Sequence, residues 1–182
     1  MLFRSVLGGL EFGVRAFFSG HLLAGVREFP GTLAQGSPPY RGPVVSADLS
    51  WPLGPSAKIR LAAERDVLYA SSLVDVGTLH YRNAYVYHRY LGEAVVNLPL
   101  QCLAFLSAGF EQSDYLLPYP YPNDTSLNER VDHRYMVGAS LLRRLGDSVR
   151  VGGHVAWARR VSSLPLFSYE GLRYGLTAEV RP

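Results

Sequence analysis

The chain has 182 residues, of which 48% are hydrophobic and only 18% charged, and its formal net charge is +3 at pH 7. The charged share is below the roughly 25% of ordinary soluble domains. The net positive charge is small, and no cluster of basic residues with interleaved aromatic residues stands out. The sequence therefore does not predict nucleic-acid binding. The single cysteine, Cys102, excludes an internal disulfide and has no metal-ligating companions. No uncharged apolar run is long enough to predict a transmembrane helix.

The first residues imitate a signal peptide, but Glu11 and Arg15 interrupt the apolar run and no small-residue cleavage site follows. The opening letters MLFRS match the translation of a common sequencing-adapter end. We therefore expect residues 1–5 not to be native and residues 6–182 to form a single domain.

From there on, segments in which apolar and polar residues alternate recur to the end of the chain, and no convincing amphipathic helix interrupts them. This period of two is typical of half-buried β-strands. Nine strands are expected, covering about residues 7–18, 22–27, 45–51, 58–64, 76–90, 94–112, 137–144, 149–157 and 172–181.

The connections between these segments alternate in length. Short turns are expected near 19–20, 52–56, 91–93 and 145–148, and longer loops near 30–43, 66–76, 113–129 and 161–168. Meanders in the bacterial outer membrane have short periplasmic turns and longer outer loops. Most of the segments also approach the roughly 9–11 residues of a membrane-spanning strand. The pattern predicts an all-β fold, an antiparallel up-and-down meander that forms a transmembrane outer-membrane β-barrel.

Each segment has one apolar face, and the sequence offers no second layer to cover it. Since only helices and closed barrels satisfy their backbone in a bilayer, we expect the apolar face to contact lipid, with Leu100 and Leu176 near the membrane midplane. An aromatic girdle is expected from Trp51 on the short-turn side and from Phe110, Tyr135, Trp157 and Tyr174 near the long-loop ends.

The polar face is expected to line a lumen. Its charges of both signs either pair and plug a narrow barrel or line a water-filled pore, and the sequence leaves both open. The expected lining residues are Glu11, Arg15, Arg27, Asp48, Lys58, Arg60, Glu64, Asn97, Gln101, Arg134, Arg150, His154, Arg173 and Glu179. No catalytic, cofactor-binding or metal-binding set is predicted, because no recognised motif or metal-ligand spacing occurs.

The C-terminal third, DHRYMVGASLLRRLGDSVRVGGHVAWARRVSSLPLFSYEGLRYGLTAEV, resembles the last three strands of the outer-membrane family called β-barrel porin type 2. Pro165, Tyr169, Glu170 and Arg173 match the family's last loop and closing strand, and YRGPVVSADLSWPLGPSAKIRLAAERD resembles an internal hairpin. The resemblance implies a Gram-negative outer-membrane location, a link in some members to exopolysaccharide export, and no catalytic residues. One departure is the end, Val180-Arg181-Pro182, because many such barrels end in an aromatic residue.

The primary hypothesis is therefore a pore or conduit in the outer membrane, not an enzyme. Its expected partners are membrane lipid, the barrel-insertion machinery and polysaccharide or small solutes. One alternative is a barrel enzyme acting on lipid or glycan, with His133 and Asp132, or His80 and Ser72, as the nearest candidates. Another is a soluble β-sandwich that binds sugar or protein. Since complete bacterial barrels have an even strand number, the pattern predicts the C-terminal part of a longer barrel, with a signal peptide and an odd number of strands missing before residue 6.

Overall fold

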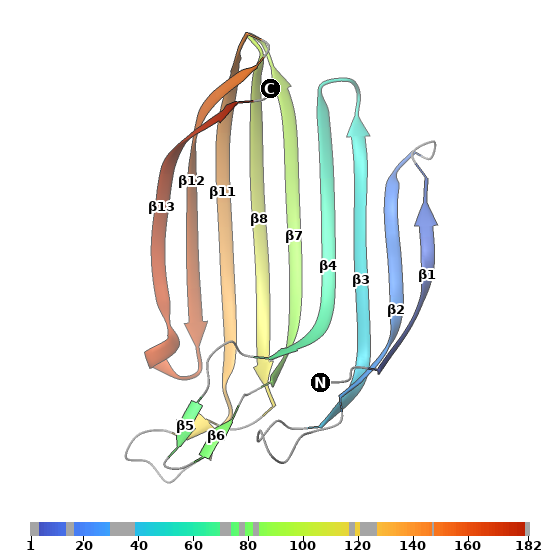
Figure 1. Ribbon diagram of the computed structural model, residues 1–182, viewed down its shortest axis with the longest axis vertical. Coiled ribbons are helices and arrows are strands. Elements are labelled where there is room, and N and C mark those ends of the chain that lie inside the picture. The colour runs from blue at the N-terminus through green and yellow to red at the C-terminus, as the bar shows by residue number, and fades with distance from the viewer. Residues whose placement is uncertain are drawn as a thin grey trace.

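The computed structural model describes residues 4–13, 17–29, 39–69, 74–76, 79–81, 84–116, 119–120, 127–146 and 148–180. Within them, nine long strands form one antiparallel sheet in which each strand pairs with the next along the sheet (Figure 1). They are β1 (Arg4–Phe12), β2 (Ser19–Phe29), β3 (Tyr40–Leu53), β4 (Ala57–Tyr69), β7 (Ala84–Leu98), β8 (Cys102–Tyr115), β11 (Val131–Leu145), β12 (Val149–Ser162) and β13 (Tyr169–Val180).

The long connections carry a few short elements. Among the described residues these are two small hairpins, β5 (Val74–Val76) with β6 (Leu79–Tyr81) and β9 (Tyr119–Pro120) with β10 (Leu127–Asn128), and one 3-10 turn, η2 (Pro165–Phe167). The expected all-β antiparallel meander is thus confirmed for the part of the chain that is described. The sheet is open: β1 and β13 are its edges and are not paired with each other.

The sheet has an apolar face and a polar face, because partners that lie directly opposite each other on neighbouring strands point to the same side. Leu106, Leu141 and Leu176 are on the apolar face, and they are 54%, 50% and 93% exposed. Few hydrophobic side chains among the described residues are buried; they are Val44, Val67, Ala84, Val86, Tyr87 and Leu164. No second layer of described residues covers the apolar face.

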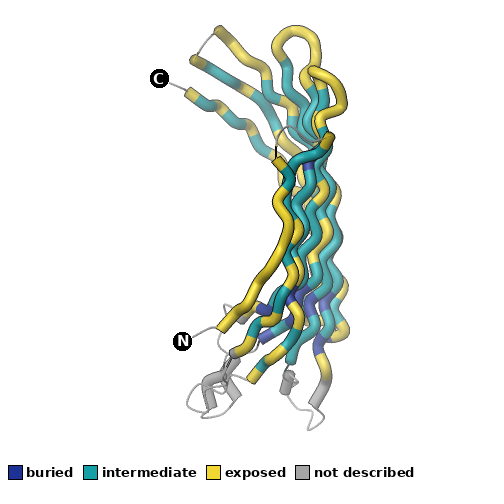
Figure 2. The backbone as a smooth tube through the Cα atoms, turned by 90° about the vertical axis from the view of Figure 1, so that its right-hand side faces the viewer, coloured by how far each residue is buried: buried dark blue, intermediate teal, exposed yellow. Residues whose placement is uncertain are grey.

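The sheet is bowed when seen along its edge, and most of its buried residues gather at the strand ends next to the long connections (Figure 2). On the polar face, Arg27 of β2 reaches across β3 to pair with Asp66 of β4 at 2.6 Å. Such a contact between strands that are not neighbours is expected where side chains converge on the inside of a curve. The polar face is accordingly the concave one.

The sheet is also slanted. Going from β3 to β12, the tip of each tight hairpin is displaced along the strand direction relative to the tip before it. The β3–β4 hairpin ends at Ala57, which lies opposite Val96, two residues short of the β7–β8 tip at Leu98. The next tip, between β11 and β12, is displaced by two further residues in the same direction. The displacement of the tips is therefore one residue per strand. With about 3.3 Å per residue along a strand and about 4.8 Å between strands, this displacement corresponds to a slant of about 35°.

The sequence misplaces two turns. The turn predicted near 19–20 falls inside β2, where Ser19 and Gly20 pair with Ser50 and Leu49 of β3. The other is predicted at residues 91–93. Gly92 instead lies inside β7, opposite Leu61 and Ala108, and the chain reverses at Leu100 and Gln101, which have φ values of 61° and 57°. Leu100 therefore does not lie near the middle of a strand, and Gln101 is a turn residue. The predicted strand at 7–18 is also wrong at both ends, because β1 runs from Arg4 to Phe12.

The turn at Leu100 and Gln101 gives a first testable prediction. Left-handed backbone conformations cost non-glycine residues roughly 1–2 kcal/mol each, and the other two tight hairpins place Gly54 and Gly146 there, with φ values of 70° and 71°. Replacing Leu100 with Asn and Gln101 with Gly is expected to raise the free energy of unfolding by about 1 kcal/mol. Equilibrium unfolding by urea measures it. Gly54→Ala is the opposite control and should destabilise; an unchanged Leu100/Gln101 double variant would contradict the turn geometry.

Candidate functional site: the polar face of the sheet

The polar side chains of the first strands are joined by short ion pairs. Arg60 on β4 donates to Asp48 on β3, with an Nε–Oδ1 distance of 3.0 Å, and to Glu93 on β7 at 2.7 Å. One guanidinium thus links three neighbouring strands. These groups border a hollow of about 350 Å³ that His21, Glu64 and Arg89 also line. The three side chains of this network are between 27% and 43% exposed, so the pairs are open to water.

A second cluster lies at the strand ends next to the long connections, and we call it the rim cluster: Tyr115, Arg130, Asp132, Arg160 and Phe167. Arg130 donates two hydrogen bonds to Asp132, at 3.0 and 2.6 Å. Its guanidinium lies between the rings of Tyr115 and Phe167, 4.2 and 3.5 Å from their centroids. Arg130 and Asp132 are both buried, and Arg160 is 3.8 Å from the same carboxylate.

The rim cluster fixes a connection to the sheet, because Phe167 belongs to η2, between β12 and β13. Leu164, just before η2, is buried, and Ser163 exchanges hydrogen bonds with the backbone of Val131. Sequence reasoning missed this cluster. Its one local signal is the spacing of Arg130 and Asp132, two residues apart and therefore on the same side of an extended chain.

Of the residues predicted to line a lumen, all but two lie on the polar face: Glu11, Arg27, Asp48, Lys58, Arg60, Glu64, Asn97, Arg134, Arg150, His154, Arg173 and Glu179. Gln101 is in the tight turn, and Arg15 lies outside the described residues. The structure brings Arg150 to 4.0 Å from Glu179 and Arg134 to 3.9 Å from Glu111.

The candidate catalytic pair His133 and Asp132 does not converge. Neighbouring residues of a strand point to opposite faces, and the His133 ring stacks 6.0 Å from Phe110 on the apolar side while Asp132 belongs to the rim cluster. The other pair, His80 and Ser72, lies outside the residues whose side chains are described. Among the described side chains, no three His, Cys, Asp or Glu residues come together to hold a metal ion.

The apolar face carries a slanted line of aromatic residues. Tyr90, Phe110 and Tyr135 lie directly opposite one another on β7, β8 and β11, with ring centroids 6.4 and 5.3 Å apart. Trp157 on β12 is displaced by two residues toward the tight hairpins, and Tyr174 on β13 by two more. We call these five residues the aromatic line. From β7 to β13 it is displaced toward the tight hairpins by one residue per strand on average, as the hairpin tips are.

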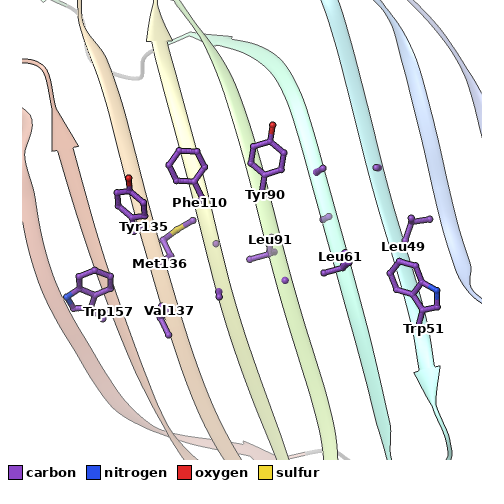
Figure 3. Close-up of a pocket in the computed structure, with 16 residues that line it drawn as sticks. Leu49, Trp51, Leu61, Tyr90, Leu91, Phe110, Tyr135, Met136, Val137 and Trp157 are labelled. Carbon is purple, nitrogen blue, oxygen red and sulfur yellow. The ribbon is translucent and has the colours of Figure 1, made fainter.

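Figure 3 shows part of the aromatic line on this face. Tyr90, Phe110, Tyr135 and Trp157 border a shallow hollow of about 770 Å³, and Trp51 borders its far side near the end of β3. The floor is formed by small residues, which include Ala47, Ala63, Gly92 and Ala108. The sequence predicted every member of the line except Tyr90, which it left on a strand of ambiguous facing.

No protein-family model, curated protein sequence or solved structure matches the chain. No helix among the described residues is long and apolar enough to cross a membrane.

Proposed function

We propose that the chain forms the wall of an outer-membrane β-barrel that acts as a pore or conduit, with the polar face toward its lumen. The observation that carries the proposal is the uncovered apolar face of a single-layer sheet. Contiguous apolar surfaces beyond a few hundred Å² mark sites that contact protein or membrane. A bilayer covers the apolar face of every strand at once. A protein partner with a single docking surface would cover only part of that face.

The slant of the sheet supports the same proposal. Strands of transmembrane barrels are tilted by about 35–45°, and the displacement of the hairpin tips corresponds to about 35°. When the strands are tilted by this angle, the hairpin tips come to one level and so does the aromatic line. An aromatic belt parallel to a row of tight turns is what an interfacial girdle requires.

The height of the apolar band also supports a bilayer. From Phe110 in the aromatic line to Cys102 at the tip of β8 is roughly 26 Å along the strand, or about 22 Å across a membrane after the tilt. The lipid-facing band of outer-membrane barrels is about 25 Å tall. Trp51, close to the opposite end of the band, supports a second interface there.

In lipid the free edges of β1 and β13 must be paired, because an unpaired strand edge is costly in hydrocarbon. We propose that they are closed in the barrel, with each other or with further strands. The resemblance of the C-terminal third to β-barrel porin type 2 supports polysaccharide or small solutes as cargo and an absence of catalysis.

Membrane fractionation of the full chain, fused to a secretory signal peptide and expressed in a Gram-negative host, tests the proposal, together with conductance of the purified protein in planar bilayers. The expected result is recovery in the outer membrane, resistance to extraction by urea, and stepwise conductance. Recovery from the soluble periplasm without detergent would refute the membrane location. A membrane-embedded protein that conducts no ions would refute the open pore.

A further inference from the structure

The polar face is divided by charge. In the described strands β1 to β7 its acidic residues, Glu11, Asp48, Glu64, Asp66 and Glu93, outnumber its basic residues, Arg27, Lys58, Arg60 and Arg89. In β8 to β13 the balance is reversed, with Arg134, Arg144, Arg150, Arg160 and Arg173 against Glu111, Asp132 and Glu179. Positive charge is therefore concentrated on the C-terminal half of the face.

Two of these arginines lie opposite each other with no carboxylate within hydrogen-bond length. Arg134 on β11 is directly opposite Arg160 on β12, a like-charge pair that is unfavourable on neighbouring strands. Their nearest carboxylates, Glu111 and Asp132, are 3.9 and 3.8 Å away, beyond hydrogen-bond length. Asp132 is also already bonded to Arg130.

Two donor atoms of these arginines have no acceptor among the described residues. The Nε atoms of Arg134 and Arg160 are buried and have no hydrogen-bond acceptor among the described residues. Arg173 on β13 forms no ion pair with any described carboxylate. Arg60 on the other half of the face, by contrast, has an acceptor within 3.0 Å on both sides.

Space for a ligand lies between Arg134 and Arg173. Arg134 and Arg173 line a hollow of about 250 Å³, several times the roughly 30 Å³ that one water molecule occupies. Small residues form its floor: Gly138, Ala156, Ala158 and Gly171. Ser107 and Tyr169 border it and carry hydroxyl groups, so the walls offer both charged and neutral donors.

We propose that Arg134 and Arg173, with the positive charge of Arg160 directly opposite Arg134, form a binding site for an oxyanion, the phosphate or carboxylate group of a solute. Guanidinium groups match such oxygens with paired, charge-assisted hydrogen bonds. A bound anion offsets the repulsion between Arg134 and Arg160 and accepts hydrogen bonds from Arg134 and Arg173. The site deepens the proposed function, on which its role in passage rests, because it makes the conduit selective for anionic cargo.

The test is the thermal unfolding midpoint of the full chain refolded in detergent micelles. Sodium phosphate and sodium glucuronate are each compared with sodium chloride at equal ionic strength. A ligand that binds the folded state raises the midpoint with its concentration. We expect at least one of the two oxyanions to raise the midpoint, and the more effective one identifies the cargo group. Arg173→Gln should weaken the apparent affinity for that oxyanion at least tenfold.

Arg159→Gln is the matched control, because Arg159 is on the same strand as Arg160 but on the apolar face. It should leave the affinity unchanged. If Arg173→Gln does not refold, Arg173→Lys keeps the charge, and only the paired hydrogen bonds are lost; a several-fold weaker affinity is expected. A midpoint that responds to neither oxyanion, or equally in wild type and in the Arg173 variant, would overturn the site.

The micelle measurement needs no conduction, so the two proposals fail separately. A protein that binds the oxyanion but gives no conductance refutes the pore and leaves the site standing. A protein that conducts but shows no oxyanion response refutes the site alone.

Discussion

Replacing Asp132 with Ala is expected to lower the free energy of unfolding by about 3–5 kcal/mol, the cost of breaking a buried ion pair by removing one partner. Asp132 is 2% exposed and accepts both hydrogen bonds of Arg130, which is 8% exposed. Its removal leaves the Arg130 guanidinium buried without a counter-charge and brings the repulsion of Arg160 to bear on it. Equilibrium unfolding by urea in detergent micelles measures the change.

Glu170→Ala is the control for this prediction. Glu170 pairs with Arg159 at 3.9 Å, but both side chains are more than half exposed. Exposed pairs of this kind contribute between about 0 and 1 kcal/mol. If the Asp132 and Glu170 variants lose equal stability, the rim cluster is not the buried contact described above.

The same variant has a local readout. Because Phe167 stacks on Arg130, loss of Asp132 frees the connection that contains η2 from the end of the polar face. Proteolytic cleavage within residues 163–168 should then become faster than in wild type. Loss of overall stability without faster local cleavage would show that the rim cluster does not hold this connection in place.

The alternation of residue types predicts the faces of the sheet well, even where it misplaces a turn. The predicted sixth strand grouped Val96, Leu98, Cys102 and Ala104 on one face, and they do share a face, although they belong to two strands. The reason is the register: Leu98 lies opposite Cys102, so the hairpin preserves the alternation. The turn was missed because Leu100 and Gln101 have no turn preference, whereas Gly92 does.

Other features depend on register and on distant residues, which local patterns do not contain. The slant of the sheet follows from where each hairpin reverses, so misplaced turns hide it. The rim cluster brings Arg130 together with Phe167, far along the chain. The shortage of carboxylates around Arg134 and Arg160 became visible only when the register set these two arginines opposite each other.

In the proposed barrel, replacing Leu141 with Arg is expected to lower the free energy of unfolding from lipid vesicles by about 2–4 kcal/mol, the cost of Arg on the lipid face near the membrane midplane. Leu141 lies on the apolar face of β11, about midway between Tyr135 in the aromatic line and Leu145 at the hairpin tip. Ser140→Arg, one residue away on the polar face, should cost less than about 1 kcal/mol, because in the proposed barrel its side chain points to the lumen. A urea titration of folding into vesicles measures both.

Leu145→Arg separates a membrane from a soluble sheet. Leu141 and Leu145 are 50% and 47% exposed, so a water-exposed sheet predicts nearly equal costs for Arg at the two positions. In a bilayer the cost depends on depth and falls to about 0–1 kcal/mol near the interface, so Leu145→Arg should be much milder than Leu141→Arg. Equal costs at Leu141 and Leu145 would contradict the bilayer, and equal costs at Leu141 and Ser140 would show that the two faces are assigned wrongly.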